Sequence, residues 1–167
     1  MSHSPTPHMM CGKIAAGKST LSAELAQRPG TVVLSEDDLL HGLYADQIAT
    51  LRDFVRCTNR IRAVLTPHIV ALLRSGLSVV LDFQANTVES RVWMRDLIDK
   101  AGVAHVLHVL DVPDEVCLAR LSVRNAAGTH AYAATEAQFH EVSKHFVPPT
   151  VEEGFEIRVH RPESVSY

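Results

Sequence analysis

The chain has 167 residues, a net charge of −3, and 46% hydrophobic against 21% charged residues. This length suits one domain, and the balance of apolar and charged residues excludes wholesale disorder. A membrane-spanning helix is excluded because no run of about 18 apolar residues occurs, and the mild acidity argues against nucleic acid as the main partner.

Along the chain, short apolar runs alternate with amphipathic helical stretches, which predicts an α/β domain with a parallel sheet. We expect a flexible N-terminus over residues 1–7 and one domain over residues 8–162. In chain order, the first half predicts a strand over 8–11, a helix over 18–27, a strand over 31–34, a helical region over 39–65 with a break near Ala45, and a helix over 66–76 begun by Thr66 and Pro67.

The second half continues the alternation. It predicts a strand over 77–81 ending at Asp82, a helix over 87–101 capped by Thr87, a strand over 105–110, a helix over 113–124, a loop over 125–134, a helix over 135–145 opened by a capping box of Thr135 and Gln138, and a strand over 155–160.

Cysteines and histidines bear on location and metal binding. Three cysteines without a C-x-x-C spacing argue against a disulfide framework or a zinc site, so we expect a reduced, cytoplasmic protein. The ten histidines are scattered. His105 and His108 share one predicted strand at a spacing that points them to opposite faces. We therefore expect surface and core histidines rather than a metal site.

The segment from Gly12 to Thr20 matches the phosphate-binding pattern G-x-x-x-x-G-K-[ST] without a mismatch. Its glycines let the backbone turn tightly, so that successive N–H groups point at one phosphate. Lys18 would reach the β- and γ-phosphates of ATP, and the Ser19 hydroxyl would ligate Mg²⁺. The residues expected to bind the nucleotide are Gly12, Lys13, Ala15, Ala16, Gly17, Lys18, Ser19 and Thr20.

Two acidic segments follow predicted strands. Asp82 ends an apolar strand, a position that suits a carboxylate holding Mg²⁺ through water, although an acid there could also cap a turn. Asp37 follows the preceding strand and could accept the proton of an attacking hydroxyl as general base. Its neighbour Asp38 could contact the acceptor or Mg²⁺, or cap the next helix.

Two arginines lie four residues apart at the end of a predicted helix and lead into a loop. We expect Arg120 and Arg124 to close over ATP, within a lid over residues 120–134, and to neutralise charge on the transferred phosphoryl group. Arg120 is also expected to bind the nucleotide. The alternative is a solvated helix face.

An acceptor-binding region is expected over residues 38–66. Arg56 and Arg60, with Arg52, form a basic flank of the helix there, which could grip an anionic acceptor or simply face solvent. At the end of the third strand, the side-chain amides of Gln84 and Asn86 could donate hydrogen bonds to an acceptor.

Together these motifs resemble the small P-loop kinases grouped with zeta toxins, chloramphenicol phosphotransferase and the kinase half of polynucleotide kinase, many of which are labelled AAA family ATPases. The resemblance lies in residues 12–20, 35–38, 82–86 and 118–125 and extends over about residues 8–160. It implies a three-layer, nucleoside-monophosphate-kinase-like fold with five parallel strands in the order 2-3-1-4-5. It also implies ATP and Mg²⁺, an Asp base at Asp37, and lid arginines at Arg120 and Arg124.

The sequence thus predicts transfer of the γ-phosphoryl group of ATP to a hydroxyl of a small molecule, of the sugar, antibiotic or nucleotide-sugar class. One alternative is a nucleotide-dependent switch or slow NTPase acting through a protein partner, which needs no base at Asp37. Another is a kinase of nucleic-acid 5′-hydroxyl ends, against which the acidic balance and the 5% aromatic content count. The acceptor and the oligomeric state are left open.

Overall fold

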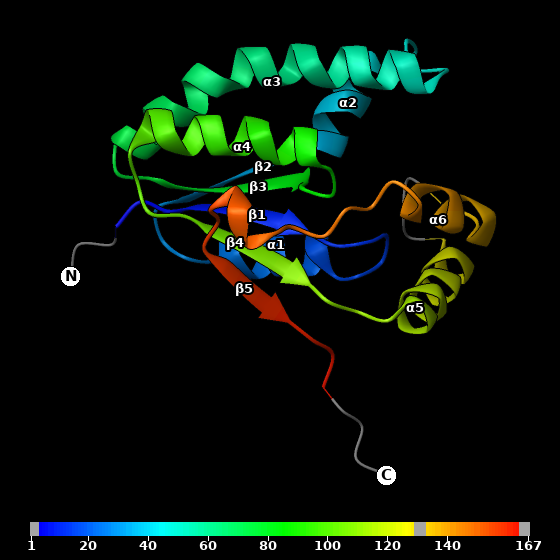
Figure 1. Cartoon of the computed structure of the whole chain (residues 1–167). Coiled ribbons are helices and arrows are strands. Elements are labelled where there is room, and N and C mark those ends of the chain that lie inside the picture. The colour runs from blue at the N-terminus through cyan, green and yellow to red at the C-terminus, as the bar shows by residue number, and fades with distance from the viewer. Residues whose placement is uncertain (1–3, 129–132, 164–167) are drawn as a thin grey trace.

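A five-stranded parallel sheet forms the centre of the computed structural model, which describes residues 4–128 and 133–163 (Figure 1). The strands stand in the order β2-β3-β1-β4-β5, as predicted. Their bounds are β1 Pro7–Cys11, β2 Thr31–Ser35, β3 Ser78–Gln84, β4 Val106–Leu110 and β5 Ile157–His160. Because every pairing is parallel, all carboxyl ends meet at one edge, where open α/β sheets gather their functional groups.

Helices cover both faces of this sheet, which confirms the predicted three-layer α/β fold. They are α1 Lys18–Ala26, α2 Glu36–Tyr44, α3 Leu51–Arg74, α4 Val88–Ala101, α5 Asp114–Ala127 and α6 Glu136–Ser143, with a short 3-10 turn, η1, over Val151–Glu153. In Figure 1, α3 and α4 lie over one face and α1 lies under the other, while α5 and α6 stand beyond the carboxyl edge.

Alternate residues of the central strands face different helices. Met9 belongs to the large core that also contains Leu73 of α3 and Leu97 of α4, whereas its neighbour Met10 packs with Leu25 of α1. Burying each such side chain stabilises the fold by roughly 1.5–3 kcal/mol. β1 is therefore buried on both faces, which is why its sequence is a short apolar run rather than an alternating one.

The largest departure from the predicted elements is α3, which runs unbroken through Pro67. Thr66 and Pro67 predict a helix start, and an internal proline costs a helix about 3 kcal/mol. Here the Thr66 hydroxyl donates to the Arg62 carbonyl at 2.7 Å and accepts from Trp93 Nε1 at 2.9 Å. Tertiary bonding and packing on both sides of the proline thus outweigh the local signal. The N-terminal half of α3 overhangs the carboxyl edge of the sheet (Figure 1).

Other boundaries move by a few residues. Pro7, expected in the flexible N-terminus, begins β1, and α2 begins at Glu36, earlier than predicted. β3 continues beyond Asp82 to Gln84, and α5 continues to Ala127, into the predicted loop. Residues 1–3 of the expected N-terminus and 129–132 of the expected lid lie outside the described residues.

The cysteines Cys11, Cys57 and Cys117 are buried free thiols. Burial raises the pKa of the Cys11 thiol to about 11, so this thiol is protonated at neutral pH and packs as a small apolar side chain. Within residues 4–128 and 133–163, no helix combines the length and the hydropathy needed to cross a bilayer.

Three histidines, brought together from three adjacent strands, form a hydrogen-bonded chain that the sequence pattern did not indicate. His8 Nδ1 lies 2.9 Å from His108 Nε2, and His108 Nδ1 lies 2.8 Å from His160 Nε2. Burial, followed by the charges of His8 and His160, lowers the pKa of His108 to about 3. His108 is therefore a neutral imidazole that donates one of these bonds and accepts the other.

The chain should consequently lose stability in acid. The pKa of His108 falls from its ordinary value of 6.5 to about 3 in the folded protein. The neutral His108 therefore contributes fully to the free energy of unfolding above pH 6.5, and this contribution declines as the pH falls toward 3. Between pH 6.5 and 5 the loss should be about 2 kcal/mol. Urea unfolding across this range measures it. The slope should flatten in His108→Gln and persist in His68→Gln, a control at an exposed histidine; equal slopes in the two variants would refute the assignment.

Candidate active site

The phosphate-binding motif forms a tight loop between β1 and α1. Its last glycine, Gly17, has φ 106° and precedes the first residue of α1, so the N-terminal N–H groups of the helix open onto the loop. Ala15 has φ 61°, a left-handed conformation that helps successive N–H groups converge on an anion. A Cβ on Gly12 would stand 3.2 Å from the Cβ atoms of Ala16 and Leu110, so glycine is needed there for close packing.

Asn86 holds the start of the loop. The Gly12 N–H donates to Asn86 Oδ1 at 2.9 Å, and Asn86 Nδ2 donates to the Gly12 carbonyl at 2.8 Å. The main-chain carbonyl of Asn86 accepts from the N–H of Val147 at 2.9 Å. The side chain is buried. The amide that the sequence suggested for an acceptor is thus engaged with the loop backbone, and Asn86 acts as a positioning residue.

Replacing this amide should weaken nucleotide binding. Asn86→Ala leaves the buried N–H of Gly12 without its partner, at a cost of about 1–3 kcal/mol, and takes from the Gly12 carbonyl one of its two donors, the other being Lys18. We expect at least about a tenfold loss of affinity for Mg-AMPPNP and a lower melting temperature, measured by calorimetric titration and thermal unfolding. Asn59→Ala, at an exposed asparagine of α3, is the matched control. Unchanged nucleotide affinity in Asn86→Ala would contradict the positioning role.

Lys18 folds back over the loop. Its ammonium donates to the carbonyls of Gly12 and Lys13, the latter at 2.8 Å. Burial lowers its pKa to about 8, while the negative charges of Asp82 and Asp37 oppose this shift. Lys18 therefore carries a positive charge at neutral pH with few strong anionic partners. Phosphate oxygens that entered the loop would supply those partners.

The acidic residues meet beside the loop. Ser35 of β2 pairs with Asp82 of β3. The first turn of α2, which contains Asp37, therefore begins next to the end of β3. Burial, followed by the charge of Asp37, raises the pKa of Asp82. The half-buried carboxylate of Asp82 thus lies beside another negative charge, and a cation bound there would stabilise it. Asp82 and the Ser19 hydroxyl at the start of α1 fit Mg²⁺, which favours one or two carboxylates plus substrate phosphates.

Of the two predicted lid arginines, Arg120 reaches the loop. Its Nη1 donates to the Ala16 carbonyl at 3.3 Å and lies beside Gly17. Arg124, one turn further along α5, lines the same surface depression as Arg120, and its Nε is buried without a hydrogen-bond partner among the described residues. The structure thus brings one guanidinium against the phosphate-binding loop and leaves the second on the same helix face.

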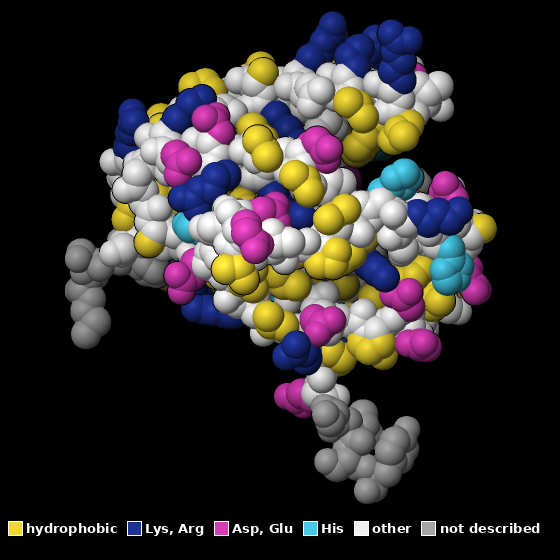
Figure 2. Space-filling view, viewed as in Figure 1, with side chains coloured by type: hydrophobic (Ala, Val, Ile, Leu, Met, Phe, Trp, Pro, Cys, Tyr) yellow, Lys and Arg dark blue, Asp and Glu magenta, His cyan; other side chains and the backbone are white. Residues whose placement is uncertain are grey.

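Several other predicted residues have local partners or face solvent. Lys13 forms an ion pair with Asp114 at 2.8 Å, so its ammonium is paired in this structure. The main-chain N–H of Asp38 donates to Ser35 Oγ, which caps α2. Arg56 pairs with Asp53 at 3.4 Å on an exposed face of α3. Arg60 of α3 and Gln84 at the end of β3 are also exposed. Figure 2 shows basic side chains gathered over the overhanging end of α3.

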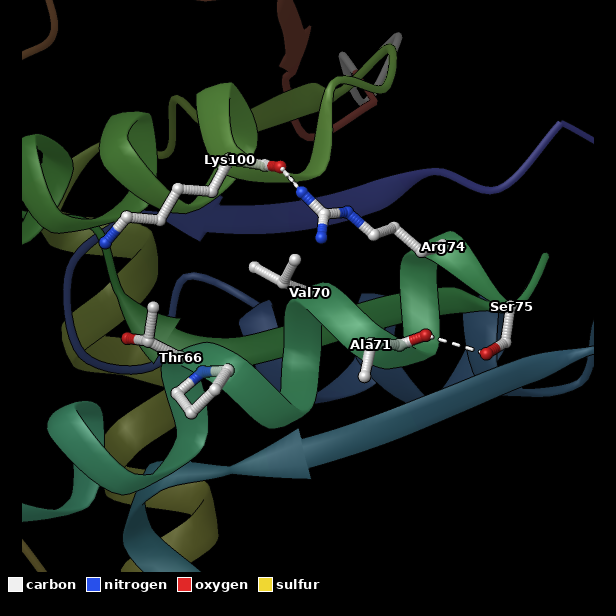
Figure 3. Close-up of a pocket in the computed structure, with 7 residues that line it drawn as sticks. Thr66, Val70, Ala71, Arg74, Ser75 and Lys100 are labelled. Carbon is white, nitrogen blue, oxygen red and sulfur yellow. Dashed lines mark hydrogen bonds between the residues drawn. The ribbon is translucent and has the colours of Figure 1, made fainter.

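A surface hollow of about 590 Å³ lies between the C-terminal parts of α3 and α4 (Figure 3). Arg74 Nη2 donates there to the main-chain carbonyl of Lys100 at 2.6 Å. Both helices lead from this hollow to the edge where strands begin, opposite the phosphate-binding loop. Its lining is apart from every group that nucleotide chemistry would use.

One known family matches the part of the chain that contains these site residues. The AAA_33 family, described as an AAA domain, matches residues 8–149. The chain belongs to this family. The match contains the loop, Asp37, Asp82 and Arg120, and it agrees with the resemblance to P-loop kinases labelled as AAA ATPases. The narrower grouping with zeta toxins stays a prediction. No curated protein matches the sequence.

Solved structures share the fold over nearly the whole chain. A proposed kinase from Chloroflexus aurantiacus has a TM-score of 0.72 at 21% identity, over 96% of this chain and 87% of that one. The APS kinase of Mycobacterium tuberculosis, in complex with AMPPNP and APS, has 0.62 at 22%, over 96% and 90%. A sugar kinase from Janibacter has 0.63 at 16%, over 95% and 86%. At these identities the likeness shows a kinase-type P-loop fold.

Proposed function

We propose that the chain is a phosphotransferase that moves the γ-phosphoryl group of ATP to a hydroxyl of a small molecule. The observation that carries this proposal is the placement of Asp37 in the first turn of α2, close enough for its charge to act on Lys18 of the phosphate-binding loop. A nucleotide switch needs only the loop. A carboxylate at this edge adds a general base for an acceptor hydroxyl.

The proposed reaction relies on positioning and charge. The loop backbone and Lys18 hold the phosphates of ATP, and Lys18 exchanges its carbonyl contacts for phosphate oxygens. Asp37 takes the proton of the acceptor hydroxyl while the hydroxyl oxygen bonds to the γ-phosphorus and the bond to the β–γ bridging oxygen breaks. Arg120 stabilises the charge on the transferred group. Ser19, and Asp82 through water, would hold Mg²⁺, which would supply positive charge to the phosphates.

Phosphorus NMR tests the proposal directly. The protein is incubated with Mg-ATP and pooled hydroxyl compounds: sugars, nucleosides, hydroxy acids, aminoglycosides and a 5′-hydroxyl oligonucleotide. We expect a new phosphomonoester resonance and ADP from at least one small-molecule pool. Release of inorganic phosphate alone, at a rate unaffected by every pool, would contradict the proposal and favour the switch. A product from the oligonucleotide alone would contradict the small-molecule acceptor.

A further inference from the structure

A largely buried arginine lies beside the proposed base. Arg62 of α3 donates through Nη2 to Glu36 Oε2 at 3.3 Å and to Ser90 Oγ at 3.2 Å, and its guanidinium stacks over the ring of Trp93 at 4.9 Å. The side chains of Arg62 and Glu36 are 13% and 6% exposed. Glu36 directly precedes Asp37, so this ion pair stands next to the group that would receive the acceptor's proton.

The ion pair leaves hydrogen-bonding capacity unused. Arg62 Nε is buried without a partner among the described residues, and so is the hydroxyl of Thr58. The two residues are four apart in α3, so their side chains are neighbours on one face of the helix. Leaving buried donors unpaired is costly. Two such atoms on one face of α3 favour a ligand group that accepts hydrogen bonds from both.

The contact between Arg62 and Glu36 is one that a ligand anion could displace. Burial raises the pKa of Glu36, although Arg62 opposes the shift. Burial therefore disfavours the charged carboxylate that pairs with Arg62. The two bonds that hold the guanidinium are long for charge-assisted contacts, which are commonly 2.7–2.9 Å. A ligand carboxylate or phosphate could displace the weak contact with Glu36 by a small rotation of the guanidinium and recruit both Nε–H and the Thr58 hydroxyl.

The location suits an acceptor rather than ATP. Arg62 contacts the first turn of α2 through Glu36 and the first turn of α4 through Ser90, at the carboxyl ends of β2 and β3. The nucleotide loop follows β1, the next strand in the sheet. Figure 2 shows a notch in the surface between the overhanging end of α3 and the α6 region, which gives a molecule access to this edge.

We propose that Arg62 and Thr58 bind an anionic group of the phosphoryl acceptor, so that the acceptor is a hydroxyl compound carrying a carboxylate or a phosphate ester. The inference rests on the proposed function for the role of the ligand as acceptor. It narrows the acceptor class, because an anionic group pairs with the charge of Arg62, whereas the hydroxyls of a neutral sugar can only accept hydrogen bonds from it. It also places the acceptor's hydroxyl toward Asp37, the neighbour of the residue that Arg62 now contacts.

Trp93 reports on this subsite. It is the one tryptophan of the chain, and the guanidinium that stacks on it moves when an anion binds. The protein is loaded with Mg-AMPPNP, so that anions cannot enter the phosphate-binding loop, and titrated with D-glycerate, D-gluconate and glycerol 3-phosphate against neutral glycerol and sorbitol. We expect saturable emission changes with the anions and none with the neutral compounds. The carboxylate and phosphate arms decide which anion is preferred. The absence of an anion-specific response would overturn the proposal.

Variants separate binding from folding. Arg62→Gln should weaken the anion response about a hundredfold, while Arg74→Gln, about 18 Å away along the same helix, should leave it intact. Thr58→Val should weaken it about tenfold with an unchanged or higher melting temperature, since the lost hydroxyl has no partner among the described residues. A wild-type response in Thr58→Val and Arg62→Gln would overturn the assignment. The titration requires no phosphoryl transfer, so a failed titration leaves the proposed function standing. Failure to detect phosphoryl transfer likewise leaves the anion-binding site standing.

Discussion

Lys18→Met should abolish phosphoryl transfer while leaving the fold intact. The ammonium of Lys18 lies over the loop, on the carbonyls of Gly12 and Lys13, where the phosphates of ATP would contact it. Loss of one such preorganised donor in a water-poor site commonly lowers rates by about 100- to 1,000-fold. Because Lys18 would contact both the ground-state phosphates and the transferred group, we expect at least about a 1,000-fold loss in kcat/KM for ATP. Methionine keeps the length and the apolar stem of the side chain.

The measurement is coupled ADP release together with the phosphomonoester signal, compared with thermal unfolding of the same samples. Lys100→Met provides the matched control, because Lys100 is an exposed lysine of α4 that pairs with Asp96. It should retain wild-type rates. Turnover of Lys18→Met within about tenfold of wild type would show that the loop does not act as a phosphate-binding catalytic element.

The central sheet and the loop were predictable because their signals are local. A short apolar run buried on both faces indicates a parallel strand wherever it occurs, and the glycine spacing around Lys18 is required by the backbone geometry of the loop itself. The strand order was implied by the family resemblance, and the structure confirms it. Thr135 and Gln138 form the predicted capping box, with bonds of 2.8 and 3.1 Å, since both partners lie within one turn.

Contacts between distant segments were not predictable. Pro67 reads as a helix start because the local cost of an internal proline is high, and the compensating bond comes from Trp93 of another helix. Asn86 reads as an acceptor contact because it follows a strand, but its partner is Gly12, 74 positions away. Arg91 is fully buried and donates to the carbonyls of Ala85 and Val147, the latter 56 positions away. In each case a partner remote in sequence decides the role.

The sequence did contain one signal for the ion pair of Glu36 and Arg62. Arg62 falls on the same face of α3 as the buried residues Thr58 and Ile61, so a charge stands where the helical period predicts an apolar side chain. Such a position requires a counter-ion or a ligand, because an unpaired charge is costly to bury. The acids after β2 could have been considered as its partner, since α3 follows α2 in the chain. Which of the three acids it meets depends on the helix start at Glu36.

Asp37→Asn should remove transfer but preserve nucleotide binding. Asparagine keeps the size and one acceptor oxygen, yet it cannot take the proton of the acceptor hydroxyl, and general-base catalysis contributes about 100- to 10,000-fold. We therefore expect at least about a 100-fold fall in kcat, with the dissociation constant for Mg-AMPPNP changed by less than about threefold, because the phosphates would contact the loop rather than this carboxylate.

Asp38→Asn is the decisive comparison, because the two carboxylates are adjacent in the first turn of α2 and differ in position alone. The Asp38 N–H caps the helix through Ser35, and asparagine preserves that bond, so Asp38→Asn should retain most of the transfer rate. Asp96→Asn, at an exposed carboxylate of α4, controls for the charge change. A larger loss in Asp38→Asn would move the base by one residue. Full activity in both would mean that the acceptor hydroxyl needs no carboxylate base, and the transfer would then rest on the loop and Arg120.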